Sequence, residues 1–174
     1  MSRSLLIVFD LDGTIWDHED ASQLKPPLKR VSKNSIIDSE GQRLNVYNDV
    51  RRVLEELRRA KNIFLAIASW NKPEIVKPIL KLLDLVVYFD YIIIEFTDRK
   101  DLMIKRIVDS IRRDYDIIIP PENIIYIDDR DVHISKIRET LGNVIFIRMW
   151  HDVKSYNELS DKVLSIISNA GNTS

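Results

Sequence analysis

The chain has 174 residues, a mass of 20.4 kDa, a formal net charge of -1 and a hydrophobic fraction of 45%. This size and composition predict one globular domain spanning residues 1–174, because two ordinary domains need a longer chain. The near-zero charge argues against nucleic acid or an anionic membrane surface as a partner. The sequence contains no cysteine, which excludes disulfides, a thiolate nucleophile and zinc–thiolate sites.

The first apolar run, Leu5 to Phe9, is too short to cross a membrane and is followed by acidic residues instead of a cleavage site. We read it as a buried strand, and we expect a cytoplasmic protein with neither a signal peptide nor a membrane segment. The absence of cysteine agrees with a reducing compartment. No pattern in the sequence indicates the oligomeric state.

Short apolar runs alternate along the chain with segments of helical periodicity. The expected strands are Leu5–Phe9, Ile63–Ala68, Tyr91–Ile94, Ile124–Ile127 and Val144–Ile147. The expected helices begin near Val50, Ile75 and Leu102, and two more span Val132–Leu141 and Leu159–Ile167. Continuous apolar strands are buried on both faces, so the pattern predicts an α/β, Rossmann-like, doubly wound and mainly parallel five-stranded sheet with helices on both faces. We expect the first strand at the centre, strands two and three on one side of it, and strands four and five on the other.

Residues 17–46 interrupt this alternation. Val31 to Ile37, a turn at Ser39 to Gly41, and Arg43 to Val46 predict a small β-hairpin inserted after the first strand. Long insertions next to a strand end often act as lids. The sequence therefore predicts a small flap in place of a large cap domain.

The strongest chemical signal is the run Asp10-Leu11-Asp12-Gly13-Thr14 at the end of the first strand. Two carboxylates at a buried strand end need a partner, and oxygen ligands favour Mg²⁺. Gly13 permits a sharp turn where a phosphate could approach. An ordinary acidic turn is the alternative, and the complete motif at a strand end makes it the weaker one.

Weaker signals follow three other strands. Asp128 and Asp129 end the fourth strand, Ser69 with Trp70 and Asn71 ends the second, and Lys100 lies just beyond the third. Taken singly, an acidic pair or a serine is often a helix cap, and a lysine is often a solvated side chain. In the predicted topology, however, these positions converge at the switch point of the sheet, where ligands bind in open α/β folds.

In order and placement, Asp10-x-Asp12-Gly13-Thr14, Ser69, Lys100 and Asp128-Asp129 resemble the four motifs of the haloacid dehalogenase superfamily. Trp16, Pro26-Pro27, the hairpin and the Ile145–Arg148 strand are similar to its small magnesium-dependent phosphatases of the acid and protein-tyrosine type. The resemblance covers nearly the whole chain. One departure is Trp70, since that group tends to carry an arginine after the serine of the second motif.

The resemblance implies a magnesium-dependent phosphatase that hydrolyses phosphate monoesters of proteins or sugars. Asp10 would be the nucleophile that forms an aspartyl-phosphate, and Asp12 the general acid and base. Mg²⁺ would be bound by Asp10, the backbone carbonyl of Asp12, and Asp128. Asp129 and Thr14 would orient these groups. The phosphate would be bound by Ser69, Trp70, Asn71 and Lys100.

Three alternatives remain open. A phosphomutase or phosphotransferase of the same superfamily normally needs a helical cap. A phosphoacceptor signalling domain would carry its acidic pair after the first strand, whereas here the pair comes late. A non-catalytic binding domain is the third.

Several aromatic and histidine side chains are ambiguous from sequence. Trp16 and Trp70 are candidates to line the substrate pocket or simply to pack, and Trp150 is a candidate for its rim. For His18 and His133 we expect surface positions.

Overall fold

A computed structural model describes the backbone of residues 4–171 and the side chains through Ser168. Its main sheet has five parallel strands in the order β6-β5-β1-β7-β8. The strands are β1 (Leu5–Phe9), β5 (Ile63–Trp70), β6 (Tyr91–Glu95), β7 (Ile124–Asp128) and β8 (Ile145–Arg148). The predicted fold class, strand number and central first strand are confirmed.

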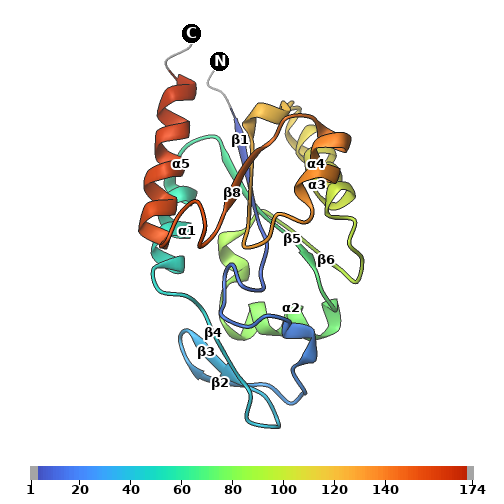
Figure 1. Cartoon of the computed structure of the whole chain (residues 1–174), viewed down its shortest axis with the longest axis vertical. Helices are drawn as coiled ribbons and strands as arrows, with labels where there is room; N and C mark the ends of the chain where they lie inside the picture. Colours follow the sequence, from blue (N-terminus) through green and yellow to red (C-terminus); the bar gives the residue numbers. More distant parts are fainter. Residues whose placement is uncertain (1–3, 172–174) are drawn as a thin grey trace.

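Helices cover both faces of this sheet (Figure 1). One face carries α1 (Val50–Arg59), α2 (Pro73–Leu82) and α5 (Tyr156–Gly171), and the other carries α3 (Lys100–Tyr115) and α4 (Ile134–Leu141). Short 3-10 helices lie at Ala21–Gln23 (η1), Val86–Tyr88 (η2) and Pro121–Asn123 (η3).

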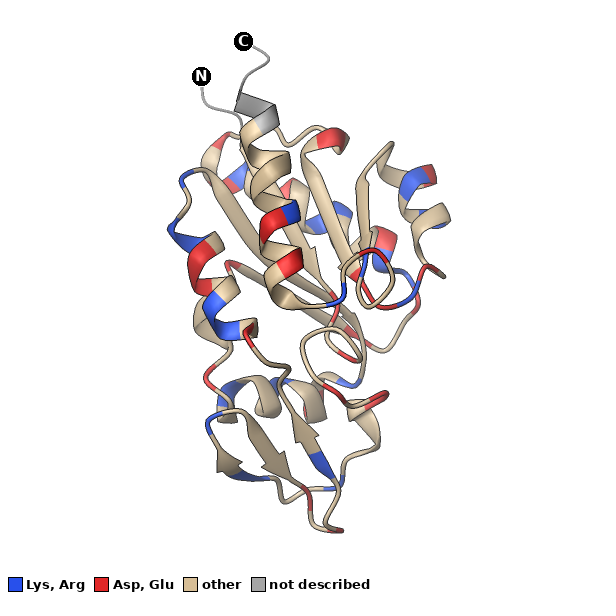
Figure 2. Cartoon of the chain, turned by 60° about the vertical axis from the view of Figure 1, so that its left-hand side comes forward, with Lys and Arg blue, Asp and Glu red and all other residues tan. Residues whose placement is uncertain are grey.

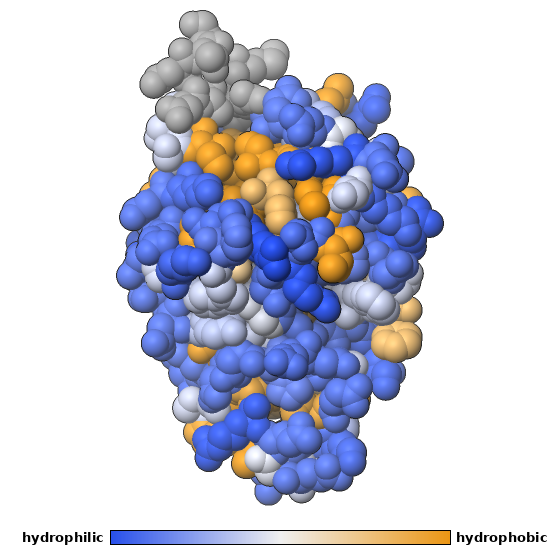
Figure 3. Space-filling view, viewed as in Figure 1, coloured by the Kyte–Doolittle hydropathy of each residue, from blue (hydrophilic) through white to orange (hydrophobic). Residues whose placement is uncertain are grey.

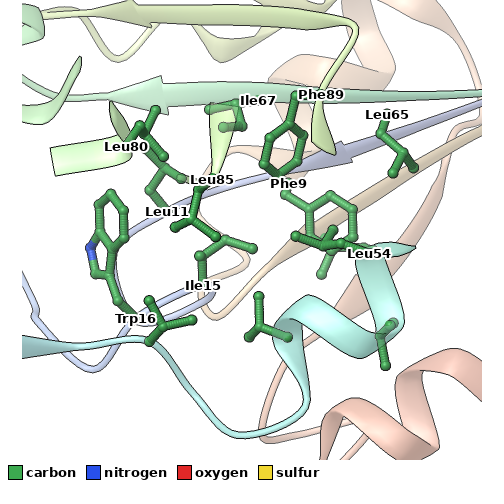
Figure 4. Close-up of a cluster of buried hydrophobic side chains, with 14 of the residues drawn as sticks. Phe9, Leu11, Ile15, Trp16, Leu54, Leu65, Ile67, Leu80, Leu85 and Phe89 are labelled. Carbon is green, nitrogen blue, oxygen red and sulfur yellow. The ribbon is translucent and has the colours of Figure 1, made fainter. Parts of the chain in front are cut away.

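The central strand β1 divides the core into two layers. Leu5, Ile7 and Phe9 pack in the cluster on the α1, α2 and α5 side, whereas Leu6 and Val8 pack in the cluster on the α3 and α4 side. Successive strand residues point to opposite faces, so an uninterrupted apolar strand is what two covered faces require. Figure 4 shows the first cluster continuing past the strand end.

Residues 17–46 contain one strand more than predicted. The small antiparallel sheet consists of β2 (Lys29–Ser32), β3 (Ser35–Ile37) and β4 (Arg43–Asn45). The run from Val31 to Ile37 is not one strand, because a tight turn at Lys33 and Asn34 folds the exposed β2 back onto β3. Asparagine favours such turns, a local signal that the apolar pattern alone does not carry.

Arg51 on α1 fastens this insertion to the body of the protein. Its guanidinium donates to the carbonyl oxygen of Lys33 at 2.6 Å, to Asn34 Oδ1 at 2.7 Å and to the carbonyl oxygen of Leu83 at 2.5 Å. The β2–β4 sheet lies at the end of the molecule beyond α2 (Figure 1). The turn of the insertion is therefore anchored to α1 through Arg51 and does not hang as a free hairpin.

Acidic and basic residues are interspersed along the helices and loops of the chain (Figure 2). The face seen in Figure 3 is largely hydrophilic, with a hydrophobic patch over the edge strand β8. Among residues 4–171, no helix is both long and apolar enough to cross a membrane.

The first turn of α3 is held by a buried carboxylate. Arg99 donates to both oxygens of Asp101, at 3.0 and 2.9 Å, and Thr140 on α4 donates at 2.9 Å. The bond from Arg99 is the largest cause of an Asp101 pKa lowered to about 2.

A carboxyl group with a lowered folded-state pKa stabilises the protein above its unfolded pKa, and this contribution is lost as the pH falls through the folded value. We expect Asp101→Asn to lower the free energy of unfolding at pH 7 by about 1 to 2 kcal/mol, allowing for the solvent around Arg99. The deficit should shrink between pH 4 and pH 2, the interval between the usual Asp pKa of 3.8 and the lowered value of about 2.

The matched control is Asp109→Asn on the same helix, since Asp109 forms only an exposed ion pair with Lys105. Such pairs contribute little to stability. Urea denaturation of both variants across this pH range measures the difference. A pH-independent deficit for Asp101→Asn would contradict the ionic origin.

Candidate active site

Asp10 lies at the carboxyl end of the central strand and is 3% exposed. Its backbone N–H donates to the carbonyl oxygen of Ile127 at 2.9 Å, which ties it to β7, and its Oδ1 lies 2.7 Å from the ammonium of Lys100. Burial is the largest cause that raises the Asp10 pKa to about 7, with Lys100 opposing and Asp128 reinforcing the rise. The ionised carboxylate is thus held at a buried strand end, where its charge is unfavourable unless cations lie close to it.

Lys100 is the first residue of α3 and is only 1% exposed. Its ammonium bridges Asp10 Oδ1 at 2.7 Å and Asp128 Oδ2 at 2.8 Å. Burial by itself lowers the pKa of Lys100, but the charges of both carboxylates and the hydrogen bonds to them raise it above its usual value. The lysine is therefore a charged link between β1 and β7.

Asp128 ends β7 and is fully buried. Burial disfavours its charge, yet Lys100 and the donors Tyr126 Oη and Arg130 N together lower its pKa. Asp128 is consequently the most firmly ionised carboxylate of the group.

The carboxylates of Asp10, Asp128 and Asp129 form a group whose nearest oxygens all lie within 4.8 Å of one another. Asp129 Oδ1 is buried without a hydrogen-bond partner, and burial first, then the hydrogen bond and charge of Asp128, raises the Asp129 pKa to about 6. Two of these carboxylates share the single ammonium of Lys100, and the third has an unpartnered oxygen. This donor set fits a hard divalent cation such as Mg²⁺. Asp129, expected only to orient its neighbour, belongs to this cluster geometrically.

Asp12 lies outside that cluster, and its side chain makes a different set of contacts. Oδ1 accepts from Trp16 Nε1 at 2.7 Å and from the N–H of Ala21 at 3.2 Å, and Oδ2 accepts from Asn71 Nδ2 at 2.6 Å. Burial is the largest cause of its raised pKa, which these three donors partly offset. A carboxyl group with a raised pKa is suited to proton transfer.

The three residues at the end of β5 and just after it, Ser69, Trp70 and Asn71, differ in burial and in their contacts. Ser69 is 1% exposed, and its Oγ lies 3.4 Å from Asn71 Nδ2. The N–H of Asn71 donates to the carbonyl oxygen of Glu95, and its side chain is engaged with Asp12, so Asn71 orients the carboxyl. Trp70 is 44% exposed and is free to meet a ligand.

A pocket of about 270 Å³ opens beside Asp12. Two of its walls are aromatic, from Trp70 and Phe96, and Arg130 contributes a cation. The other wall comes from Glu19, Asp20 and Ser22 at η1. Within the predicted flap, the segment around η1 therefore lines this pocket, whereas the strands β2 to β4 do not.

The structure decides the open question on Trp16 and contradicts one expectation. Trp16 is fully buried and packs in the core shown in Figure 4, so of its two candidate roles the packing role holds, and its indole N–H donates to Asp12. His133, expected at the surface, is only 7% exposed and lies edge-on to Trp70 at 6.2 Å between ring centroids.

The sequence reasoning missed Tyr126, Phe96 and Arg130. Tyr126 looks like any core residue of an apolar strand, although its position two residues before Asp128 places its hydroxyl on that carboxylate. Phe96 directly follows the end of β6, and Arg130 is the second residue after β7. This closeness to a strand end is the one signal that could have indicated them.

Gly13 brings the two acidic segments into contact. It has a φ of +65°, and a Cβ at this position would lie 2.6 Å from Asp129 Oδ2. Thr14 Oγ1 accepts from the N–H of Asp129 at 3.1 Å and closes the same junction. Only glycine fits this close approach.

We expect Gly13→Ala to destabilise the protein by about 2 kcal/mol more than Gly41→Ala, because both share a positive φ but only the first displaces Asp129. Gly41 is the matched control, since a Cβ there meets nothing within 4 Å. Guanidinium denaturation of the two variants measures the difference, and equal losses would show that backbone strain alone accounts for the effect.

Solved structures of other proteins share this fold. A haloacid dehalogenase superfamily hydrolase from Ehrlichia chaffeensis is superposed with a TM-score of 0.67 and 15% identity, covering 96% of this chain and 99% of that one. The 3-deoxy-D-manno-octulosonate 8-phosphate phosphatase of Moraxella catarrhalis, solved with magnesium, phosphate and the sugar, gives a TM-score of 0.57 and 19% identity over 98% of this chain and 92% of its own. At these identities the likeness concerns the fold.

Sequence comparison gives the family. The human magnesium-dependent phosphatase 1 is 32% identical over 84 residues, which is 48% of this chain and 48% of that protein. A Saccharomyces cerevisiae relative is 35% identical over 80 residues, 42% of this chain and 44% of its own. The matched stretches thus span about half the length of these curated relatives. The sequence profile of the family described as Acid Phosphatase matches residues 3–149. With that match over most of its length, the chain belongs to the acid phosphatase family, the type of phosphatase that its motifs resemble.

Proposed function

We propose that this protein is a magnesium-dependent phosphatase that hydrolyses phosphate monoesters through an aspartyl-phosphate on Asp10. The observation that carries the proposal is that an oxygen-donor cluster and a buried lysine meet at adjacent strand ends, next to the carboxyl group of Asp12, which has a raised pKa and lines a pocket. The magnesium dependence of the human relative, stated in its name, supports the choice of cation.

Asp10 is the proposed nucleophile. One of its oxygens is held by Lys100, which leaves the other free to attack phosphorus in line with the departing oxygen. The new bond joins that oxygen to phosphorus while the bond to the leaving alcohol breaks, and Asp12 gives its proton to the alcohol oxygen. Because Asp12 lines the pocket, its carboxyl faces the place where the leaving group lies.

Water completes the reaction. It attacks the phosphorus of the aspartyl-phosphate, Asp12 takes one of its protons, and the bond to Asp10 breaks to release inorganic phosphate. Asn71, which holds Asp12 at 2.6 Å, and Trp16 fix the carboxyl for both transfers.

A cation bound by Asp10, Asp128 and Asp129, with the Asp12 carbonyl expected as a further ligand, would supply positive charge against the repulsion between an anionic nucleophile and an anionic ester. Ser69 and Lys100 are the proposed partners of the phosphoryl oxygens. Thr14 holds Asp129 in place from the other motif.

The leaving group is proposed to occupy the 270 Å³ pocket between Trp70 and Phe96. Both rings are well exposed, at 44% and 68%, so a phosphorylated protein side chain can reach them as readily as a sugar phosphate. Similar phosphatases tend to carry an arginine at the position of Trp70. Here the leaving group would meet an aromatic ring instead of a positive charge.

Asp10→Asn should reduce hydrolysis of p-nitrophenyl phosphate by at least about 10⁴-fold, because an amide is not a nucleophile. Wild-type turnover should need Mg²⁺ and stop with EDTA. Asp109→Asn, an exposed change on α3, is the control and should keep the wild-type rate. Turnover by folded Asp10→Asn at the control rate would refute the proposed function.

Trp70→Ala should raise the KM for p-nitrophenyl phosphate about three- to tenfold, as expected for losing one stacking contact. The KM for acetyl phosphate, whose leaving group is too small to span the pocket, should change by less than about twofold. Tyr115→Ala removes another exposed aromatic ring, remote from the pocket, as a control. Equal changes for both substrates would place Trp70 outside the leaving-group site.

A further inference from the structure

The last residue of β8 and the two residues after it, Arg148 to Trp150, contact both acidic motifs of the site. Trp150 Nε1 donates to the carbonyl oxygen of Gly13 at 2.7 Å. The N–H of Met149 donates to the carbonyl oxygen of Asp128 at 2.9 Å, and Arg148 Nε donates to that of Asp129 at 3.1 Å. We call these three residues the clasp, because one continuous segment bonds to the loop after β1 and to the end of β7.

The conformation of Trp150 sets it apart from ordinary packing. Its φ is +65°, in the left-handed region that bulky residues rarely adopt because it is strained. The indole is held there by its bond to Gly13 and by the ring of Tyr47, 4.5 Å away between centroids. Backbone strain of this kind persists only where surrounding contacts impose it.

The segment holds together two acidic motifs whose charges repel each other. Asp10, Asp128 and Asp129 place carboxylate oxygens within 4.8 Å of one another, and their charges repel. Lys100 links Asp10 to Asp128, but it makes no bond to Asp129. Asp129 is fixed through its backbone, by Arg148 at its carbonyl oxygen and by Thr14 at its N–H.

We propose that the clasp is a positioning device that sets Mg²⁺ affinity by holding the Asp10 loop and the Asp128–Asp129 pair at the separation a single cation needs. This inference rests on the proposed function, since it concerns the same metal cluster. None of the clasp side chains lines the pocket beside Asp12, so substrate binding should be insensitive to them. Residues that orient metal ligands typically change metal affinity 10- to 100-fold when mutated.

Two substitutions test the clasp at different bonds. Trp150→Phe keeps a ring against Tyr47 and removes only the N–H donor to Gly13. Arg148→Met removes the donor to Asp129 together with the ion pair to Asp131. Tyr47→Phe is the matched control, because it keeps the ring contact with Trp150 and removes a hydroxyl without a hydrogen bond in the described structure.

Mg²⁺ binding is measured by isothermal titration calorimetry on folded protein without substrate, and KM for p-nitrophenyl phosphate is measured at saturating Mg²⁺. We expect Trp150→Phe and Arg148→Met each to raise the Mg²⁺ Kd about tenfold or more. KM should stay within about twofold of wild type, and Tyr47→Phe should match wild type in both. A general loss of packing would instead lower the denaturation midpoint and shift KM with Kd.

Mg²⁺ affinities of the two clasp variants within twofold of wild type would overturn the clasp and leave the proposed function standing. A wild-type protein that binds no Mg²⁺ would overturn both. Should Trp150→Phe fail to fold, Arg148→Met decides alone, because Arg148 is a partly exposed residue whose loss leaves the core intact.

Discussion

The ammonium of Lys100 lies buried between the carboxylates of Asp10 and Asp128, and the rest of the site depends on this placement. Burying a carboxylate costs free energy unless a cation compensates its charge. The single lysine neutralises only part of the negative charge of the cluster. The incomplete compensation appears in the raised pKa values of Asp10 and Asp129, at about 7 and about 6. The cluster therefore keeps negative charge that a bound divalent cation would balance.

Topology makes the arrangement attainable. Because β5, β1 and β7 are adjacent and parallel, Ser69, Asp10 and Asp128 come from neighbouring strand ends at the same edge of the sheet. The helix after β6 brings Lys100 back to that edge, and the bonds of Asp101 keep its first turn in place. Core packing on both faces of β1 therefore supports the site from below.

Much of this was predictable, since continuous apolar strands and acidic residues at strand ends are patterns that chain order alone displays. The five strands, the central β1 and the meeting of Asp10, Lys100 and Asp128 followed from them. What could not be predicted depended on single tertiary contacts. The burial of Trp16 needs the partner Asp12, and no periodicity marks the turn that makes β2.

The anchoring of the insertion by Arg51 bears on which acceptor the proposed mechanism would use for the phosphoryl group. A cap that swings shut would exclude solvent and let a bound alcohol compete for the aspartyl-phosphate. Here the small sheet is tied to α1 and stands clear of a pocket whose aromatic walls stay open. Under the proposed mechanism, such an open pocket would let water compete with a second alcohol for the aspartyl-phosphate and so would favour hydrolysis over transfer.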